Sequence, residues 1–279
     1  MIALVTGASS GIGAATARRL AREPGARLVL VARRRERLEA LAAELGGATV
    51  IAADLTDPGA PARIAAEVER EHGRLDLLVN NAGAPGRGSF GRGGWAGVQA
   101  IMALNFDSQV RLTEALLPLL RRSVPSAIVN VASVAGRVAR ASAGDYSASK
   151  FALTGWTEAL HLEERRHGVH VGLVLPGFVA TEGFPQRELV NRRLTRWLVS
   201  SEDKVAEAIV DAGLRRKAER YAPRPYALVP VVRALAPPLY RRAVGGGRRF
   251  TPGTATNPVQ EAGRVPDGHE PPAGPGPAS

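Results

Sequence analysis

The residues whose types and spacing suggest chemistry most directly are Tyr146 and Lys150, in the sequence YSASK at 146–150. On a helix, this spacing places the phenol and the ammonium on one face. A free tyrosine has a pKa of about 10 and is a weak base near neutrality. A neighbouring cation favours the phenolate, so the pair predicts a general acid or base for a carbonyl or hydroxyl oxygen. The alternative is a surface pair on a helix.

Two further polar residues, Ser133 and Asn105, are candidates for the same site. Ser133 follows the predicted strand 127–131, where its hydroxyl would orient a substrate oxygen beside the phenol. Asn105 lies within a predicted long helix, which is an unfavourable position for asparagine. A break in that helix would free a backbone carbonyl to hold a water molecule near Lys150. The alternatives are a cap at Ser133 and a solvated helix position at Asn105.

A glycine-rich turn with the sequence TGASSGIG follows the first predicted strand, at residues 6–13. Glycines there let the backbone approach a pyrophosphate, which binds the free N–H groups at the start of the next helix. Glycine also serves ordinary turns, but the position directly after an amino-terminal strand favours a dinucleotide site. The predicted cofactor contacts in this turn are Gly7, Ser9, Ser10, Gly11, Ile12 and Gly13.

The end of the second predicted strand bears on the choice of cofactor. Dinucleotide folds that prefer NAD carry an acidic residue there, which binds the ribose 2′-hydroxyl. This chain has Arg33 and Arg34 instead. Guanidinium groups bind phosphate through charge-assisted hydrogen bonds, so the sequence predicts NADP(H) in preference to NAD(H). The alternative is that both arginines form the solvated start of a helix.

Small and polar residues also follow the third and fourth predicted strands, at the edge where open α/β sheets bind ligands. Asp54, which precedes Leu55, would accept a hydrogen bond from the adenine amino group, and could equally cap a helix. Asn81, Ala82 and Gly83 would let the adenosine lie against the backbone, although the same residues are typical of a turn. All five are predicted cofactor contacts.

Taken together, these motifs resemble those of the short-chain dehydrogenase/reductase family in order and in spacing. The matching features are TGASSGIG, NNAG at 80–83, Asn105, Ser133 and YSASK. Pro176-Gly177 with Thr181 resembles the family's PGxxxT segment, which contacts the nicotinamide amide. The resemblance covers roughly residues 1–217, and Arg33 falls where NADP-preferring members carry a basic residue.

The resemblance implies a proton relay of Asn105, Ser133, Tyr146 and Lys150, hydride transfer to or from NADP(H), and a homodimer or homotetramer. It adds to the predicted cofactor-binding set the residues Tyr146, Lys150, Pro176, Gly177, Val179 and Thr181. The partner would be a small-molecule alcohol or carbonyl compound. A non-catalytic NADP-binding sensor of the same fold and an epimerase or dehydratase relative are the alternatives.

Two segments depart from the family pattern. Residues 84–94 form an arginine- and glycine-rich loop without an apolar stripe. Residues 225–244 are apolar but interrupted by prolines, as in some lipid- or steroid-active relatives. This stretch predicts a packed or interfacial helix and a hydrophobic substrate.

Around these residues, short apolar strands alternate with helical patterns. The alternation predicts a single Rossmann-type α/β domain, with a doubly wound parallel sheet in three α/β/α layers. The predicted strands are 2–6, 27–32, 49–53, 75–80, 127–131, 170–175 and 220–222. The predicted helices are 12–22, 35–45, 60–71, 96–121, 146–166 and 204–217.

The predicted catalytic domain spans residues 1–244. It includes a helical substrate flap at 182–200 and the apolar extension at 225–244, and a disordered tail follows at 245–279.

Composition excludes several classes of protein. The chain has no cysteine, which rules out disulfides and thiolate sites, and no metal site is predicted. No signal peptide or membrane-spanning run is evident, so we expect a cytoplasmic protein in which only peripheral membrane contact is open. The net charge of +11 is spread over helices without interleaved aromatic residues, which disfavours nucleic-acid binding.

Overall fold

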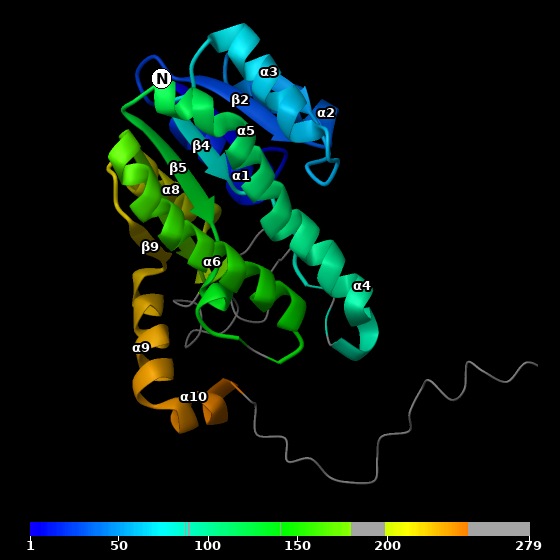
Figure 1. Ribbon diagram of the computed structural model, residues 1–279, viewed down its shortest axis with the longest axis vertical. Coiled ribbons are helices and arrows are strands. Elements are labelled where there is room, and N and C mark those ends of the chain that lie inside the picture. The colour runs from blue at the N-terminus through cyan, green and yellow to red at the C-terminus, as the bar shows by residue number, and fades with distance from the viewer. Residues whose placement is uncertain (87, 89, 140, 180–198, 245–279) are drawn as a thin grey trace, which may run out of the picture. The chain divides into compact units, whose positions relative to one another are not determined.

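The computed structural model describes residues 1–86, 88, 90–139, 141–179 and 199–244. Seven parallel strands form one sheet in the order β3-β2-β1-β4-β5-β6-β9 (Figure 1). They are β1 (Ile2–Thr6), β2 (Arg27–Ala32), β3 (Thr49–Ala52), β4 (Leu77–Asn80), β5 (Ser126–Val131), β6 (Val169–Pro176) and β9 (Glu219–Ala222). A separate two-stranded pair consists of β7 (Phe178–Val179) and β8 (Val199–Ser200).

Helices connect the strands. They are α1 (Gly11–Leu20), α2 (Arg35–Glu44), α3 (Ala60–His72), α4 (Phe90–Met102), α5 (Ser108–Arg122), α6 (Gly144–Glu164), α8 (Glu202–Gly213), α9 (Leu228–Leu235) and α10 (Pro237–Val244). A π-helical turn, Ala103–Asp107, joins α4 to α5. Shorter 3-10 turns are η2 (Val134–Gly136), η3 (Arg165–His167) and η5 (Arg224–Ala227).

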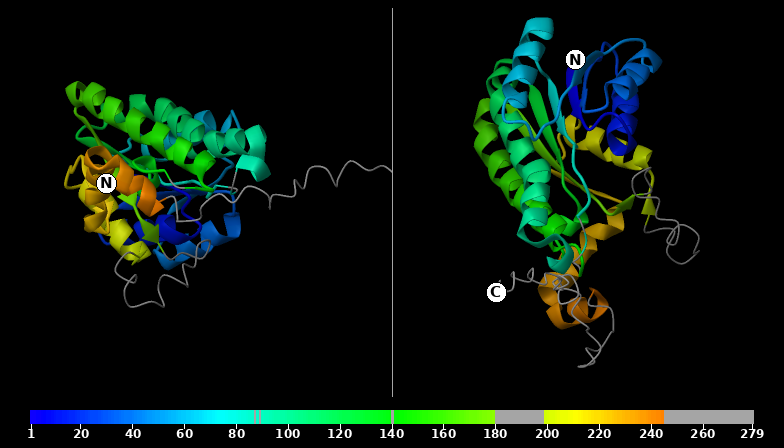
Figure 2. Two further views of the ribbon diagram at one scale, coloured as in Figure 1. Left: turned by 90° about the horizontal axis from the view of Figure 1, so that it is seen from below. Right: turned by 90° about the vertical axis from the view of Figure 1, so that its right-hand side faces the viewer.

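Alternate residues along each strand point to opposite faces of the sheet, and both faces are covered by helices (Figure 2). In β1, Ala3 and Val5 pack with residues of α1, α2 and α8. Ile2 and Leu4 pack with residues of α3, α5 and α6 on the other face. The predicted Rossmann-type parallel sheet in three layers is therefore confirmed.

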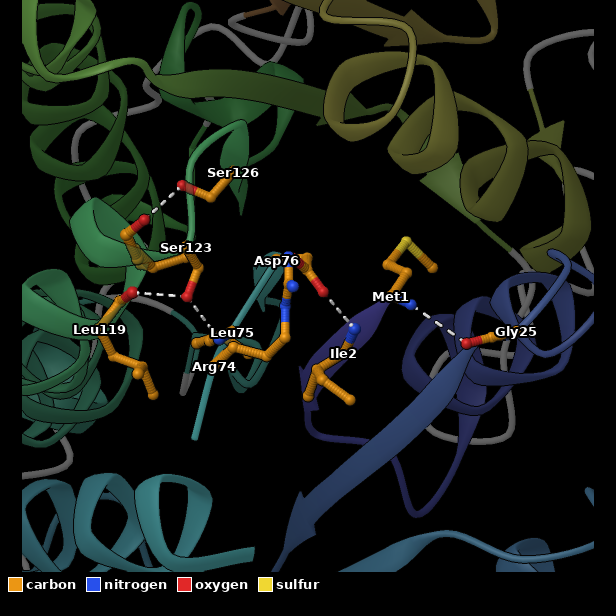
Figure 3. Close-up of polar contacts among 10 residues, drawn as sticks. Met1, Ile2, Gly25, Arg74, Leu75, Asp76, Leu119, Ser123 and Ser126 are labelled. Carbon is orange, nitrogen blue, oxygen red and sulfur yellow. Dashed lines mark hydrogen bonds and ion pairs between the residues drawn. The ribbon is translucent and has the colours of Figure 1, made fainter. Parts of the chain in front are cut away.

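Polar contacts tie together the amino ends of the strands (Figure 3). The Asp76 carboxylate accepts a hydrogen bond of 2.6 Å from the Ile2 N–H. The Ser123 hydroxyl accepts from the Leu75 N–H at 3.0 Å and donates to the Leu119 carbonyl at 2.8 Å. These contacts fix the starts of β1 and β4 relative to α5. The predicted site residues follow the opposite, carboxyl ends of the strands, where open α/β sheets bind ligands.

The largest correction concerns the long helix predicted over 96–121. It begins at Phe90, within the predicted loop 84–94, and has a kink at Gly94. The π-helical turn that divides it lies where the break at Asn105 was predicted. The other predicted strands and helices agree to within a few residues: β4 begins at Leu77 rather than residue 75, and α8 ends at Gly213 rather than residue 217. The 225–244 stretch was predicted to be either a packed or an interfacial helix. A helix packed into the protein is wrong for α9, because none of its residues is buried.

Residues Met1–Gly245 form one compact unit. The predicted flap lies outside the described residues, except for its last two, which form β8 rather than helix. The predicted tail also lies outside them. The domain boundaries therefore stay predictions.

Candidate active site

The glycine-rich turn lies where β1 and β4 are neighbours, which is the point where the strand order reverses and open α/β sheets bind ligands. Gly7 has a φ of +67°, and a Cβ there would lie 2.9 Å from Asn81 Nδ2. A Cβ on Gly13 would lie 2.2 Å from the Gly7 carbonyl oxygen. The Thr6 hydroxyl accepts hydrogen bonds from the N–H groups of Asn81 and Ala82 at 2.9 and 3.0 Å. The turn after β4 is thus locked against the turn after β1.

The two arginines after β2 differ in their surroundings. Arg34 reaches across the glycine-rich turn, where Nη2 donates to the hydroxyls of Ser9 at 3.0 Å and Ser10 at 2.8 Å. Arg33 is exposed and forms no ion pair with the residues that the structure describes. The pair therefore presents a positive surface beside the turn, with the guanidinium of Arg33 open to an anion.

Asp54 lies beyond β3, close to Arg33. Its Oδ1 accepts hydrogen bonds from the Thr56 N–H at 2.9 Å and the Thr56 hydroxyl at 2.7 Å. These two bonds, and to a lesser degree the charge of Arg33, lower the pKa of Asp54. The helix-cap alternative is wrong, because α3 begins at Ala60 with Gly59 at its N-cap. A contact of Asp54 with adenine stays a prediction.

Lys150 is buried, with 4% of its surface exposed. Its Nζ donates a hydrogen bond of 2.9 Å to the Val131 carbonyl at the end of β5 and lies 5.9 Å from the centre of the Tyr146 ring. Burial lowers the pKa of Lys150 from 10.5 to about 8. Tyr146 is half-buried in the first turn of α6. The surface-pair alternative is therefore wrong.

Asn105 occupies the centre of the π-helical turn, so the predicted break in the helix is confirmed. The side chain is fully buried, which makes the solvated alternative wrong. Its Oδ1 accepts from the Ala84 N–H at 2.8 Å, and its Nδ2 donates to the Ala84 carbonyl at 3.0 Å and to the Ser149 hydroxyl at 3.1 Å. The role of its backbone carbonyl stays a prediction.

Ser133 caps η2, which confirms the predicted alternative of a cap at this residue. Its Oγ accepts a hydrogen bond of 3.1 Å from the Ala135 N–H. The same hydroxyl lies 3.3 Å from the Pro176 carbonyl oxygen, to which it donates. The turn packs closely on α6, since a Cβ on Gly136 would lie 2.5 Å from the Lys150 carbonyl oxygen. Ser133 is thereby held between the end of β6 and the start of α6.

The separate motifs meet at Gly83. A Cβ there would lie 3.1 Å from Asn105 Oδ1 and 3.7 Å from Lys150 Nζ. The segment after β4, the π-helical turn and α6 therefore converge at one place on the carboxyl edge. The sequence predicted these residues individually, and the fold brings them together.

The nicotinamide-side segment is described only in part. Gly177 contacts the ring of Tyr226, to which an added Cβ would approach within 2.4 Å, and its N–H donates to the Ala222 carbonyl at 2.8 Å. Val179 is buried in β7, and Thr181 lies outside the described residues.

Four positioning residues were not predicted from the sequence: Thr6, Gln109, Ser149 and Tyr226. Ser149 accepts from Asn105 and donates to the Tyr146 carbonyl at 2.8 Å, and Gln109 donates to the Ala82 carbonyl at 2.9 Å. Thr6 and Ser149 lie within the recognised motifs and could have been found there. Gln109 and Tyr226 carry no signal in the sequence, because their contacts cross long separations.

In the described part of the chain, no cluster of acidic, histidine or cysteine residues could hold a metal ion. No helix there is both long and apolar enough to cross a bilayer.

Comparison with known proteins agrees with this geometry. A family model described as "short chain dehydrogenase" matches residues 1–189. The chain is 40% identical over 211 residues to a "Putative ketoacyl reductase" of Streptomyces coelicolor, covering 72% of this chain and 78% of that protein. It is 31% identical over 248 residues to a "3-ketodihydrosphingosine reductase" of Bacteroides thetaiotaomicron, covering 88% and 87%.

A third relative is the bovine "Dehydrogenase/reductase SDR family member 7B", 34% identical over 190 residues, which cover 64% of this chain and 58% of that protein. Among solved structures, a short-chain dehydrogenase from Streptomyces avermitilis matches with a TM-score of 0.72 and 30% identity, covering 89% of this chain and 98% of that one. The resemblance seen in the motifs is confirmed: the chain belongs to the short-chain dehydrogenase/reductase family.

Proposed function

We propose that this oxidoreductase interconverts an alcohol and a carbonyl compound with NADP(H) as cofactor, using Tyr146 as general acid and base. Its family acts on carbonyl or hydroxyl groups with NAD(P)(H). The observation that carries the proposal is the buried Lys150 ammonium beside the Tyr146 ring at the carboxyl edge. A cation in this place favours the phenolate, which suits a phenol that gives and takes a proton.

The residues at the site fit a dinucleotide. The side-chain-free turn at Gly7 and Gly13 leads into the positive end of α1, where a pyrophosphate is favoured. Arg33, with Arg34 beside it, would hold the 2′-phosphate of NADP(H). The remaining predicted contacts are Ser9, Ser10, Gly11, Ile12, Asp54, Leu55, Asn81, Ala82, Gly83, Pro176, Gly177, Val179 and Thr181. When bound, the nicotinamide would supply or accept the hydride.

In the reducing direction, the Tyr146 phenol gives its proton to the carbonyl oxygen as that oxygen gains negative charge. The Ser133 hydroxyl orients the same oxygen. The Lys150 ammonium stabilises the phenolate left behind, and the buried Asn105 holds the neighbouring backbone in place for the relay. In the oxidising direction, the phenolate takes the proton back.

We further propose a hydrophobic substrate. The segment between Ser133 and Tyr146 contacts both α9 and α10. The Arg137 carbonyl accepts a hydrogen bond from Arg233, and the Ala139 carbonyl accepts one from the Tyr240 hydroxyl. Apolar residues of both helices, Pro230, Ala234 and Pro237, line a hollow beside Ala139. The relative named as a 3-ketodihydrosphingosine reductase carries a lipid name, which agrees with a long-chain ketone.

The test is NADPH consumption with a panel of long-chain, steroid and short polar ketones, for the parent and for Tyr146→Phe. The variant removes the proton donor, so turnover should fall by about 10²–10⁴ with nearly unchanged NADPH affinity. Tyr221→Phe on β9 is the matched control and should keep its turnover. Turnover of Tyr146→Phe within threefold of the parent would exclude the phenol as acid. A parent that binds NADPH but converts no substrate would support the sensor alternative.

A further inference from the structure

The helix α9 presents its apolar side chains to solvent. Leu228, Val231, Val232 and Leu235 stand at positions i, i+3, i+4 and i+7, which is one face of a helix. Their exposed fractions are 66%, 49%, 41% and 81%, and Leu239 of α10 is exposed to 62%. We call these five residues the apolar face. In an ordinary surface helix this stripe would lie against the core.

Polar side chains fasten the two helices from the inner side. Arg233 Nη1 donates a hydrogen bond of 2.7 Å to the Arg137 carbonyl, and its guanidinium lies 5.3 Å from the centre of the Phe151 ring. The Tyr240 hydroxyl donates to the Ala139 carbonyl. The outward direction of the apolar face is therefore held by contacts to the body of the enzyme. In Figures 1 and 2, both helices extend beyond the carboxyl end of β9.

The charged side chains of α9 and α10 all have one sign. The two helices contain Arg233, Arg241 and Arg242 and no aspartate or glutamate. Arg241 and Arg242 are exposed at the end of α10. A hollow of about 560 Å³ between the helices and Ala139 is lined by Arg233, Tyr240 and Arg241. Exposed leucines with guanidinium groups beside them suit a partner that has an apolar interior covered by anionic groups.

From these observations we propose that α9 and α10 dock the enzyme on an anionic phospholipid membrane. The leucines and valines enter the boundary of the acyl chains, and Arg241 and Arg242 lie among the phosphate groups. A second copy of the chain fits less well, because a two-fold contact would bring the same arginines together with no carboxylate in the segment to pair with them. Residues 245–279 fit less well too, since Phe250, Val259 and Val265 are their only large apolar residues.

The experiment is cosedimentation of the full chain with phosphatidylcholine vesicles, with and without phosphatidylglycerol. Neither cofactor nor ketone is added, so failure here leaves the proposed function untouched. The parent should bind the vesicles that contain phosphatidylglycerol, and salt should weaken binding. Leu235→Glu should weaken it about tenfold or more, as expected for one leucine that is no longer buried. Replacing both Arg241 and Arg242 with alanine should weaken it about 30-fold.

The matched control is Leu162→Glu, which makes the same change at a leucine exposed to 72% on α6, away from the apolar face. It should bind vesicles like the parent, and all variants should keep the parent's melting temperature. Three results would overturn the proposal. They are no binding of the parent to phosphatidylglycerol vesicles, an equal loss in Leu162→Glu, and a lipid-free dimer that Leu235→Glu converts to monomers.

Discussion

At the scale of single residues, the preference for one cofactor depends on Arg33. The guanidinium is exposed, and Arg34 is already engaged with Ser9 and Ser10. A charge-assisted hydrogen bond contributes about 1.5–3 kcal/mol. This corresponds to a factor of roughly 10 to 150 in binding. One such hydrogen bond from Arg33 is therefore strong enough to discriminate a 2′-phosphate from a 2′-hydroxyl.

We expect the parent to favour NADPH over NADH at least tenfold in kcat/KM, and Arg33→Asp to reverse that order. The new carboxylate repels the phosphate and can accept a hydrogen bond from a free 2′-hydroxyl. Arg35→Asp is the matched control, because Arg35 is exposed two positions further along the chain and pairs with Glu39 of its own helix. The control should keep the NADPH preference. A parent that prefers NADH would refute the role of Arg33.

Lys150 makes a prediction about stability and pH. Burial lowers the pKa of Lys150 from 10.5 to about 8, so the folded protein releases this proton at a lower pH than the unfolded chain does. Below about pH 8 the lysine is charged in both states, and the full cost of burying the charge is present. Between pH 8 and 10.5 the unfolded chain binds more protons, so Lys150 makes the free energy of unfolding rise with pH. The change amounts to about 3 kcal/mol.

Lys150→Met removes this titration and the catalytic cation together. The stability of the variant relative to the parent should therefore fall by about 3 kcal/mol between pH 7 and pH 10.5, as measured by urea unfolding. The packing change at this position is the same at both pH values, so the comparison isolates the part that depends on protonation. Lys204→Met, at an exposed lysine of α8, should show no such change. A difference between Lys150→Met and the parent that does not vary with pH would contradict the buried charge.

At the scale of elements, η5 supports the end of β6. The Tyr226 ring packs on Gly177, directly after the Pro176 carbonyl that accepts from Ser133. Burial raises the pKa of Tyr226, in keeping with a ring set into the protein. The segment that follows β9 is thereby coupled to the loop that would face the nicotinamide. No spacing within the sequence indicates this contact, because it joins residues 49 positions apart, from 177 to 226.

A double-mutant cycle measures this coupling. Gly177→Ala should destabilise the parent by about 1–3 kcal/mol, because the added Cβ would lie 2.4 Å from Tyr226 Cε2. The same change should cost much less in a Tyr226→Ala background, where the space is open. Gly155→Ala in α6 is the matched control: its Cβ meets no atom within 4 Å, so urea unfolding should show no loss. Equal costs of Gly177→Ala in the two backgrounds would disprove the coupling.

At the scale of the whole molecule, the compact unit Met1–Gly245 contains the sheet and all the described site residues. Residues 246–279 are rich in glycine, proline and alanine and contain few large apolar side chains. A segment with this composition buries too little apolar surface to offset the entropy of ordering it. The oligomeric state and the cytoplasmic location stay predictions at this scale.

Deleting residues 246–279 should therefore leave the melting temperature and the turnover of a water-soluble ketone essentially unchanged. The comparison uses thermal unfolding and initial rates of the full and shortened chains at equal concentration. A fall of several degrees in the melting temperature would show that the segment packs on the enzyme despite its composition.

The sequence alone determined the parallel sheet. Strands buried on both faces appear as apolar runs, and the helices that cover them appear as helical periodicity, and both patterns are local. It also determined that the glycine-rich turn follows β1 and that Tyr146 and Lys150 share a helix face, since both follow from spacing along one element.

Tertiary structure decided which distant groups meet. Lys150 reaches Val131, and Asn105 reaches Ala84 through a π-helical turn. Tertiary structure also decided that the apolar face of α9 points outward, because the inner contacts of Arg233 and Tyr240 fix the rotation of the two helices. Periodicity shows that a helix has an apolar side, but only packing against the rest of the chain determines where that side points.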